Sequence, residues 1–166
     1  CEHGHLKIAQ LLLNLIPHIN ISACNDYAFY FACKNKHIKV ARWLLAVKPN
    51  IDISRNDDCI FRCVCGNGNI EIAMWLLCIK PSIDISASNN EAFRRACCNG
   101  HLEIARWLHN IKTDIYCNKN DDCIFYWVCG NGHLQLARWL LSVKHDININ
   151  TAFRYACENG NIEISK

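Results

Sequence analysis

The sequence predicts an all-α solenoid, in which short helix-turn-helix units stack in a line. The first observation is a repeat. The stretch 90–108 recurs along the chain at steps of 32 residues, except for a last step of 28, and we call one position in each copy the anchor: His5, His37, Asn69, His101, His133 and Asn161. The second observation is the pattern inside the period. A Cys stands four residues before every anchor, a Phe eight residues before five of them, and Leu or Ile directly after. These are helical spacings on both sides of a turn, which is Asn-Gly in most copies.

The period divides the chain into a single array of units. In order, these are a partial unit (1–22), four units (23–54, 55–86, 87–118 and 119–146) and a second partial unit (147–166). A unit of this size cannot bury its apolar face alone and is completed by its neighbours. Arrays normally close with atypical, polar-faced units, and neither end has that pattern. We therefore expect the chain to be an interior piece of a longer array.

The elements follow the same plan in each unit. In unit 23–54 the spacing predicts a first helix over 27–34, capped by Asn25 or Asp26, and a second helix over 37–48, ended by Pro49. The next residues, Ile-Asp-Ile-Ser, alternate apolar and polar and predict a short extended connecting loop. Lys36 stands where the other copies have Gly, so it is predicted to adopt a positive φ.

Later units vary this plan. In unit 55–86, Asp57 or Asp58 is the predicted cap. In unit 87–118, Thr113 replaces the Pro after the second helix, and Ile-Tyr-Cys replaces Ile-Asp-Ile in the connecting loop.

The repeat resembles the ankyrin repeat. The resemblance is carried by a small pair, Ala96-Cys97, by the turn Asn99-Gly100-His101 and by the Leu-Glu-Ile-Ala that opens the second helix, and it extends over essentially the whole chain. The Thr-Pro-Leu-His opening of the family is absent, and only Thr151 keeps its Thr. This variant is similar to the ankyrin proteins of giant DNA viruses of amoebae. The resemblance implies a non-catalytic array that binds a protein partner on its concave face of first helices and loops, in the host-cell cytoplasm and against host proteins.

Composition argues against several other classes. The net charge of +3 is small and dispersed over the second helices, so nucleic-acid binding is not expected. No apolar run is long enough to cross a bilayer, which takes about 18 residues. Thirteen cysteines in a small chain are typical of a disulfide scaffold. Six of them, however, occupy the repeat position that the ankyrin family fills with Ala, and we expect these to behave as small buried hydrophobes in a reducing compartment.

Motifs that resemble catalytic or metal sites are explained better by the repeat. Cys-x-x-x-His occurs in four copies, for example Cys97 with His101, and both residue types bind zinc. Two copies have Asn instead of His, and the pairs recur once per unit instead of converging, so no metal or cofactor is expected. Gly66-Asn-Gly68 lacks the remaining glycine of a dinucleotide loop. No set of groups for catalysis converges, and we expect neither an enzyme nor a small-molecule substrate.

Positions that change from copy to copy indicate the partner face. Six and seven residues before the anchor, the types change among Tyr, Trp, Phe and Arg, which are enriched in interfaces. The second residue of each pair is also compatible with a partly buried role, since the family has Leu there. The resemblance adds the residues before the first helix. The candidate partner-binding residues are Tyr30, Phe31, Arg62, Arg94, Arg95, Tyr126, Trp127, Arg154, Tyr155, Arg55, Asn56, Asp58, Lys119, Asn120 and Asp122.

A second aromatic row has a different interpretation. Trp43, Trp75, Trp107 and Trp139 occupy one fixed position on the second helices, which favours packing between units over binding. The alternative function is a structural component of a larger assembly, in which the array packs by its sides. That alternative predicts a partner buried against the Trp-bearing helices.

Overall fold

A computed structural model describes residues 1–116, 122–144 and 147–161 of the chain. Its described residues form α-helices and one 3-10 helix and contain no strand. This confirms the predicted all-α class. The elements are α1 (Leu6–Leu15), α2 (Ala23–Lys34), α3 (Ile38–Val47), α4 (Arg55–Gly66), α5 (Ile70–Ile79), α6 (Ala87–Cys98), α7 (Leu102–Ile111), η1 (Thr113–Tyr116), α8 (Asp122–Gly130), α9 (Leu134–Val143) and α10 (Ile149–Glu158).

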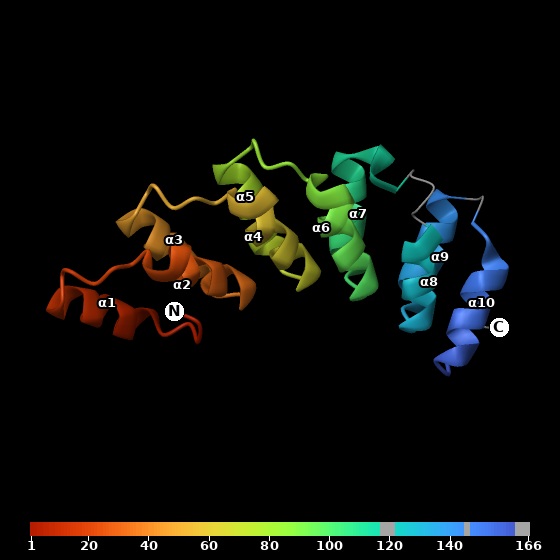
Figure 1. Cartoon of the computed structure of the whole chain (residues 1–166), viewed down its shortest axis with the longest axis horizontal. Coiled ribbons are helices and arrows are strands. Elements are labelled where there is room, and N and C mark those ends of the chain that lie inside the picture. The colour runs from red at the N-terminus through yellow and green to blue at the C-terminus, as the bar shows by residue number, and fades with distance from the viewer. Residues whose placement is uncertain (117–121, 145–146, 162–166) are drawn as a thin grey trace.

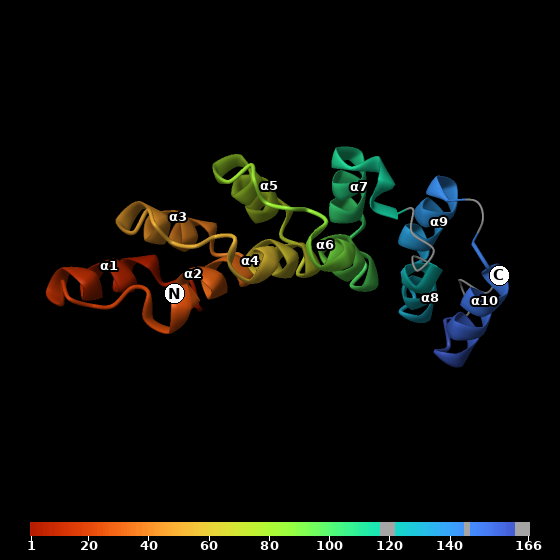
Figure 2. The same cartoon turned by 45° about the horizontal axis from the view of Figure 1, so that its top comes forward.

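The helices form an arch with the two termini toward opposite ends (Figure 1). The first helices of the units, α2, α4, α6, α8 and α10, lie along its inner side. The second helices, α3, α5, α7 and α9, lie along its outer side, and the turned view shows the same two rows (Figure 2). The first helices α2, α4, α6 and α8 each pack against the second helix of their own unit and against the next first helix, most extensively between α4 and α6 and between α8 and α10.

The invariant positions of the repeat form a continuous core. Phe29 and Phe61 are buried, and their rings lie 6.2 Å from Trp75 and 6.3 Å from Trp107, each one unit further along. The Trp row therefore packs between units, as predicted. The anchor-minus-four cysteines of the complete units, such as Cys65, are also buried. They contribute to the core as small hydrophobes.

The turn between the two helices needs a left-handed residue. Gly100 has φ 77°, and a Cβ added there would lie 2.6 Å from Nδ1 of His133, the next anchor. Lys36 adopts the same region with φ 66°, as the sequence predicts. A Cβ added at Gly132 would likewise lie 2.7 Å from Oδ1 of Asn161, the next anchor there. Glycine is therefore required in most turns by backbone conformation and by the packing of the next unit.

The anchors cap helices in the preceding unit. The side-chain amide of Asn69 donates to the carbonyl of Lys34 at the end of α2 (3.0 Å), and Nε2 of His133 lies 3.1 Å from the carbonyl of Cys98 at the end of α6. The Asn of the turn makes a parallel contact, since the Asn99 amide donates to the carbonyl of Gly66 (2.6 Å). These bonds satisfy carbonyls that a helix C-terminus leaves open. The anchor is thus a contact between units, a role that its place before the second helix did not indicate.

The first helices begin differently from the prediction. Cys24, Asn25 and Asp26, inside α2, have φ of 56°, 58° and 59°, and the same left-handed turn occurs at residues 56–58 and 88–90. Asn and Asp, which fill most of these places, tolerate this conformation better than other side chains. No side chain caps the helix itself in α2, α4 or α6. The predicted caps instead reach the following connecting loop: Asp58 accepts a bond from the backbone N–H of Asp84 (3.0 Å).

The connecting loop of unit 87–118 also differs. Where an extended segment is expected, Thr113–Tyr116 form the 3-10 helix η1, and both Ile115 and Tyr116 are buried. The ring of Tyr116 lies 5.7 Å from Phe93, and Asn90 donates to the carbonyl of Ile115 (3.2 Å). The larger Tyr side chain is accommodated because the loop turns into the core.

Candidate functional site

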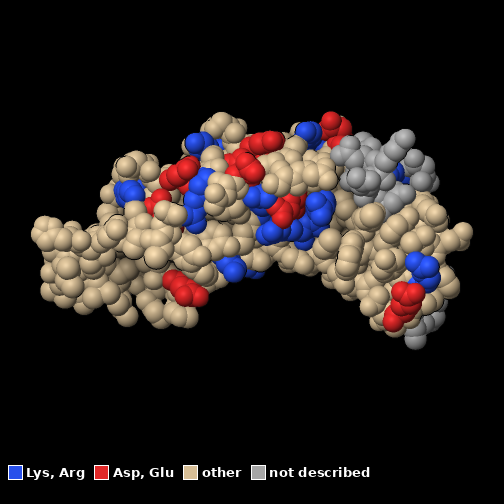
Figure 3. All heavy atoms as spheres, in the orientation of Figure 1, with Lys and Arg blue, Asp and Glu red and all other residues tan. Residues whose placement is uncertain are grey.

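The variable positions of the repeat lie on the first helices, along the inner side of the arch. In copy after copy, residues ten, seven and six before the anchor share one helix face, because their spacing of three and four residues matches a helical turn. Over α4 and α6, basic and acidic side chains gather on this side of the molecule (Figure 3). The predicted binding residues fall into two groups on this face.

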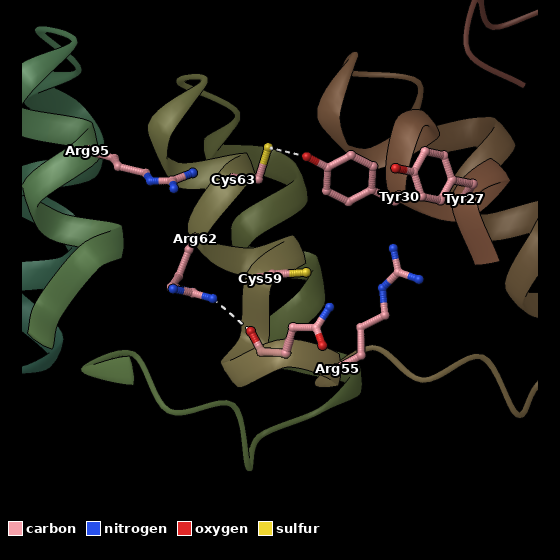
Figure 4. Close-up of a pocket in the computed structure, with 8 residues that line it drawn as sticks. Tyr27, Tyr30, Arg55, Cys59, Arg62, Cys63 and Arg95 are labelled. Carbon is pink, nitrogen blue, oxygen red and sulfur yellow. Dashed lines mark hydrogen bonds between the residues drawn. The ribbon is translucent and has the colours of Figure 1, made fainter. Parts of the chain in front are cut away.

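The first group surrounds a hollow between α2, α4 and α6 (Figure 4). We call it the arginine hollow; its volume is about 310 Å³. It is lined by Tyr27, Tyr30, Arg55, Asn56, Cys59, Arg62, Cys63 and Arg95. Five of these are predicted site residues, and they come from three consecutive units. The stacking of the units brings them together.

Two of the three arginines share one carboxylate. Glu91, on α6, forms an ion pair with Arg62 of α4, and it also accepts from Nε of Arg95 at 2.9 Å, one helical turn further on. Arg62 donates in addition to the backbone carbonyl of Asn56 (2.7 Å). Arg62 is therefore held in place, whereas the side chain of Arg95 is 51% exposed.

The third arginine packs on an aromatic ring. The guanidinium carbon of Arg55 lies 5.8 Å from the centroid of the Tyr30 ring, a distance suited to a cation–π interaction. The Nε of Arg55 is buried without a hydrogen-bond partner among the described residues. The Tyr30 hydroxyl lies 3.4 Å from Sγ of Cys63. This hydrogen bond, together with burial, raises the pKa of Tyr30 to about 12, so the phenol is neutral at pH 7.

The second group lies on α8 and α10. The rings of Tyr126 and Tyr155 stack with centroids 6.0 Å apart and planes 9° apart. Arg154 lies 5.9 Å from the Tyr155 ring and forms an ion pair with Glu158 (3.6 Å). Trp127 is 57% exposed, so it does not take the partly buried role that the family's Leu at this position implied. An exposed Trp beside stacked tyrosines is typical of an interface anchor.

The remaining predicted residues are placed as follows. Phe31 is half-buried, with its ring 5.3 Å from that of Tyr27, and Arg94 is exposed on α6. Asp58 is buried, with 7% of its surface exposed, and its bond to the connecting loop gives it a structural role in place of a surface one. Lys119 and Asn120 lie outside the described residues. Asp122 begins α8, but its side chain also lies outside the description.

Three residues that line the arginine hollow, Tyr27, Cys59 and Cys63, are missing from the predicted site residues, and so is the neighbouring Glu91. Tyr27, Cys59 and Glu91 all stand ten residues before an anchor. This position also varies between copies, so the same signal that selected its neighbours could have found it. Tyr27 is 51% exposed at the rim, and Glu91 determines how much positive charge remains in the hollow.

Among the described residues, the cysteines and histidines of the repeat are not gathered into a metal site. In the part of the chain that the structure describes, no three His, Cys, Asp or Glu side chains are grouped to hold an ion. Burial raises the pKa of Cys33 to about 12 and that of Cys129 to about 11, which disfavours the thiolate that zinc requires. The helices in the described ranges are all too short or too polar to cross a membrane.

Comparison with protein families agrees with the architecture. A family model described as ankyrin repeats (3 copies) matches residues 93–166, and one described as ankyrin repeats (many copies) matches residues 1–45. This chain is built of ankyrin repeats. A comparison with curated proteins gives no match.

The ankyrin assignment explains the distribution of residues just described. Ankyrin repeats are protein-interaction modules, and proteins built of them are in general not catalytic. In this ankyrin array the repeated positions form the core and the positions that change are gathered on one face. A solenoid of this kind presents an extended surface to a partner.

Proposed function

We propose that this ankyrin array binds a partner protein through the inner face of its first helices and carries out no chemistry. One observation supports this most directly. In the four complete units, the positions that are invariant between copies, such as Phe61 and Cys65, are buried, whereas the varying positions include Trp127 and Arg95, which are about half exposed or more. Tyr, Trp and Arg are the types that dominate binding energy in protein interfaces.

The proposal can be tested by a pull-down from cell lysate. The binding variant changes Arg94, Arg95, Tyr126 and Trp127 together to Ala. A matched control changes Arg106, Arg138, Met74 and Ile111, which are two arginines and two exposed apolar residues on the outer row of helices. Both variants are first checked for unchanged helicity by circular dichroism.

We expect a protein that is retained by the wild type and by the control variant but is lost with the binding variant. If the control variant loses the protein and the binding variant retains it, the inner-face proposal is wrong. If no variant differs from the wild type, the proposal fails as well.

A second candidate is an array that packs by its sides in a larger assembly. It is favoured by a row of exposed aliphatic side chains at the last turn of successive second helices: Leu15, Val47, Ile79 and Ile111, which are 68%, 40%, 38% and 49% exposed. A partner held by this row would be lost with the control variant of the pull-down. The same experiment therefore separates the two candidates.

The finer parts of the proposal concern where the array acts. We place it in the cytoplasm and propose that it recruits proteins of a host cell, on the resemblance of the repeat variant to ankyrin proteins of giant DNA viruses. Core cysteines such as Cys33, which serve as buried hydrophobes, fit a reducing compartment. Localisation of the tagged protein by microscopy tests the first of these, and the identity of the retained protein tests the second.

A further inference from the structure

The arginine hollow carries more positive charge than its surroundings neutralise. Three arginines line it, and Glu91 is the carboxylate that contacts them among the described residues. Arg62 is held by Glu91 and by a backbone carbonyl. Arg55 has no ion pair with a described carboxylate, and Arg95 shares its carboxylate with Arg62. A guanidinium excess of about two charges therefore remains in a confined space.

The arrangement suits an anionic group such as a carboxylate. Guanidinium donors form a planar fork that pairs with two carboxylate oxygens, and such charge-assisted bonds are about twice as strong as neutral ones. The buried Nε of Arg55 lacks the hydrogen bond that buried donors normally make. The Tyr30 ring beneath Arg55 and the Tyr27 ring at the rim would cover the apolar part of an acidic side chain.

The excess positive charge is also confined to a small area, which favours a partner with a short acidic stretch. Nucleic-acid binding needs a row of cations that follows a phosphate backbone. Here the excess is confined to three helices. The α8–α10 group next along the face presents stacked tyrosines and one arginine, Arg154, whose charge is balanced by Glu158. A short acidic stretch next to an aromatic contact matches this distribution.

We propose that the arginine hollow binds an acidic segment of the partner protein, with Arg55 and Arg95 pairing directly with its Asp or Glu side chains. Arg62 positions the site by holding Glu91 and the start of α4. This inference rests on the proposed function, and it adds the chemical class of the partner segment and the residues that recognise it.

The test is an NMR titration of the arginine Nε–Hε resonances with a peptide that contains four consecutive glutamates. The same peptide with glutamines is the control ligand. The protein variants are R55Q, R95Q and, as a matched control on the outer helices, R106Q; thermal unfolding checks that each is folded. NMR is suited to this test because a short peptide is expected to bind weakly.

We expect the resonances of Arg55 and Arg95 to shift saturably with the glutamate peptide and not with the glutamine peptide. Removing either arginine should weaken binding about fivefold or more, since a charge-assisted bond is lost, and R106Q should leave binding unchanged. Equal shifts at exposed outer arginines, equal weakening by R106Q, or no saturable shift would overturn the inference. Tighter binding of a single-stranded oligonucleotide of similar length would overturn it too.

The outcome is separable from that of the proposed function. If R55Q and R95Q still retain the protein that the four-residue binding variant loses in the pull-down, the inner face binds a partner, but the arginine hollow does not bind its acidic side chains. If the binding variant retains every protein that the wild type retains, the proposed function fails, whatever the peptide titration shows.

Discussion

Two substitutions at the same position of the repeat test the packing argument. Phe93 and Phe153 both stand eight residues before an anchor, so the sequence treats them alike. In the structure, Phe93 is fully buried, with its ring 5.7 Å from Tyr116 and 6.4 Å from Trp139 of the next unit. Phe153 is 51% exposed on α10. The comparison is between Phe93→Ala and Phe153→Ala.

The expected magnitudes follow from burial. Replacing a fully buried Phe by Ala removes its transfer free energy and leaves a cavity, and it costs about 3–5 kcal/mol of unfolding free energy. For Phe153, only about half of a transfer free energy of roughly 1.5–3 kcal/mol is lost, and no closed cavity forms, so we expect about 1 kcal/mol. The two variants should therefore differ by about 2 kcal/mol or more.

Equilibrium urea unfolding, followed by far-UV circular dichroism, measures both values. The slope of the unfolding free energy against urea concentration should be similar for the wild type and the two variants, so that differences in the midpoints report differences in stability. Phe61→Ala, at a position that is also fully buried and packed on Trp107, serves as a second buried case and should behave as Phe93→Ala does. If Phe153→Ala costs as much as Phe93→Ala, the burial of the side chain is not what determines the cost of the substitution.

Three further predictions follow from the same structure. Gly100→Ala should lower the free energy of unfolding by about 1–2 kcal/mol or more, measured by urea unfolding, because φ is left-handed there and the new Cβ would contact the next anchor. Lys36→Gly, at the equivalent turn, should not destabilise the array. Burial lowers the pKa of His101 below its usual 6.5, so the unfolded chain binds more protons near that pH. The contribution of His101 to the free energy of unfolding should then be fully present above about pH 6.5 and be lost as the pH is lowered through the folded-state pKa. His101→Asn should reduce this loss, and a pH profile of stability that the substitution leaves unchanged would contradict the assignment. The buried Cys33, whose pKa is raised to about 12, should resist alkylation by iodoacetamide at pH 8, while the exposed Cys78 reacts, as peptide mass spectrometry would show; equal labelling would contradict this.

The sequence was informative wherever local spacing controls structure. The two helices of each unit, the left-handed turn at Lys36 and the burial of Cys65 all follow from the period and from backbone preferences, and the structure confirms them. The prediction for the start of the first helices was wrong in detail. The predicted caps Asp26 and Asp58 bond to the connecting loop at the end of their own unit, because that loop folds back over the left-handed turn.

The candidate site could be predicted only in part. Variation between copies selected Tyr30, Arg62 and Arg95, which the structure brings together in the arginine hollow. It did not select Glu91, although the same variation occurs at its position. No sequence pattern shows that an acid on one helix neutralises an arginine 29 residues earlier on another.

The sequence by itself determined the unit: its helices, its turn and the face that must be buried, since these depend on residues within a few positions of each other. The tertiary structure decided what each copy of the unit does. Stacking places anchors such as Asn69 and His133 on the helix end of the preceding unit and buries Phe93 against Trp139 of the next unit. It also ties Arg62 to Glu91 and places Arg55 on the Tyr30 ring, with an Nε donor that has no partner among the described residues. These differences arise because the free energy of a side chain in a solenoid depends on the neighbouring unit, and identical motifs meet different neighbours along the array.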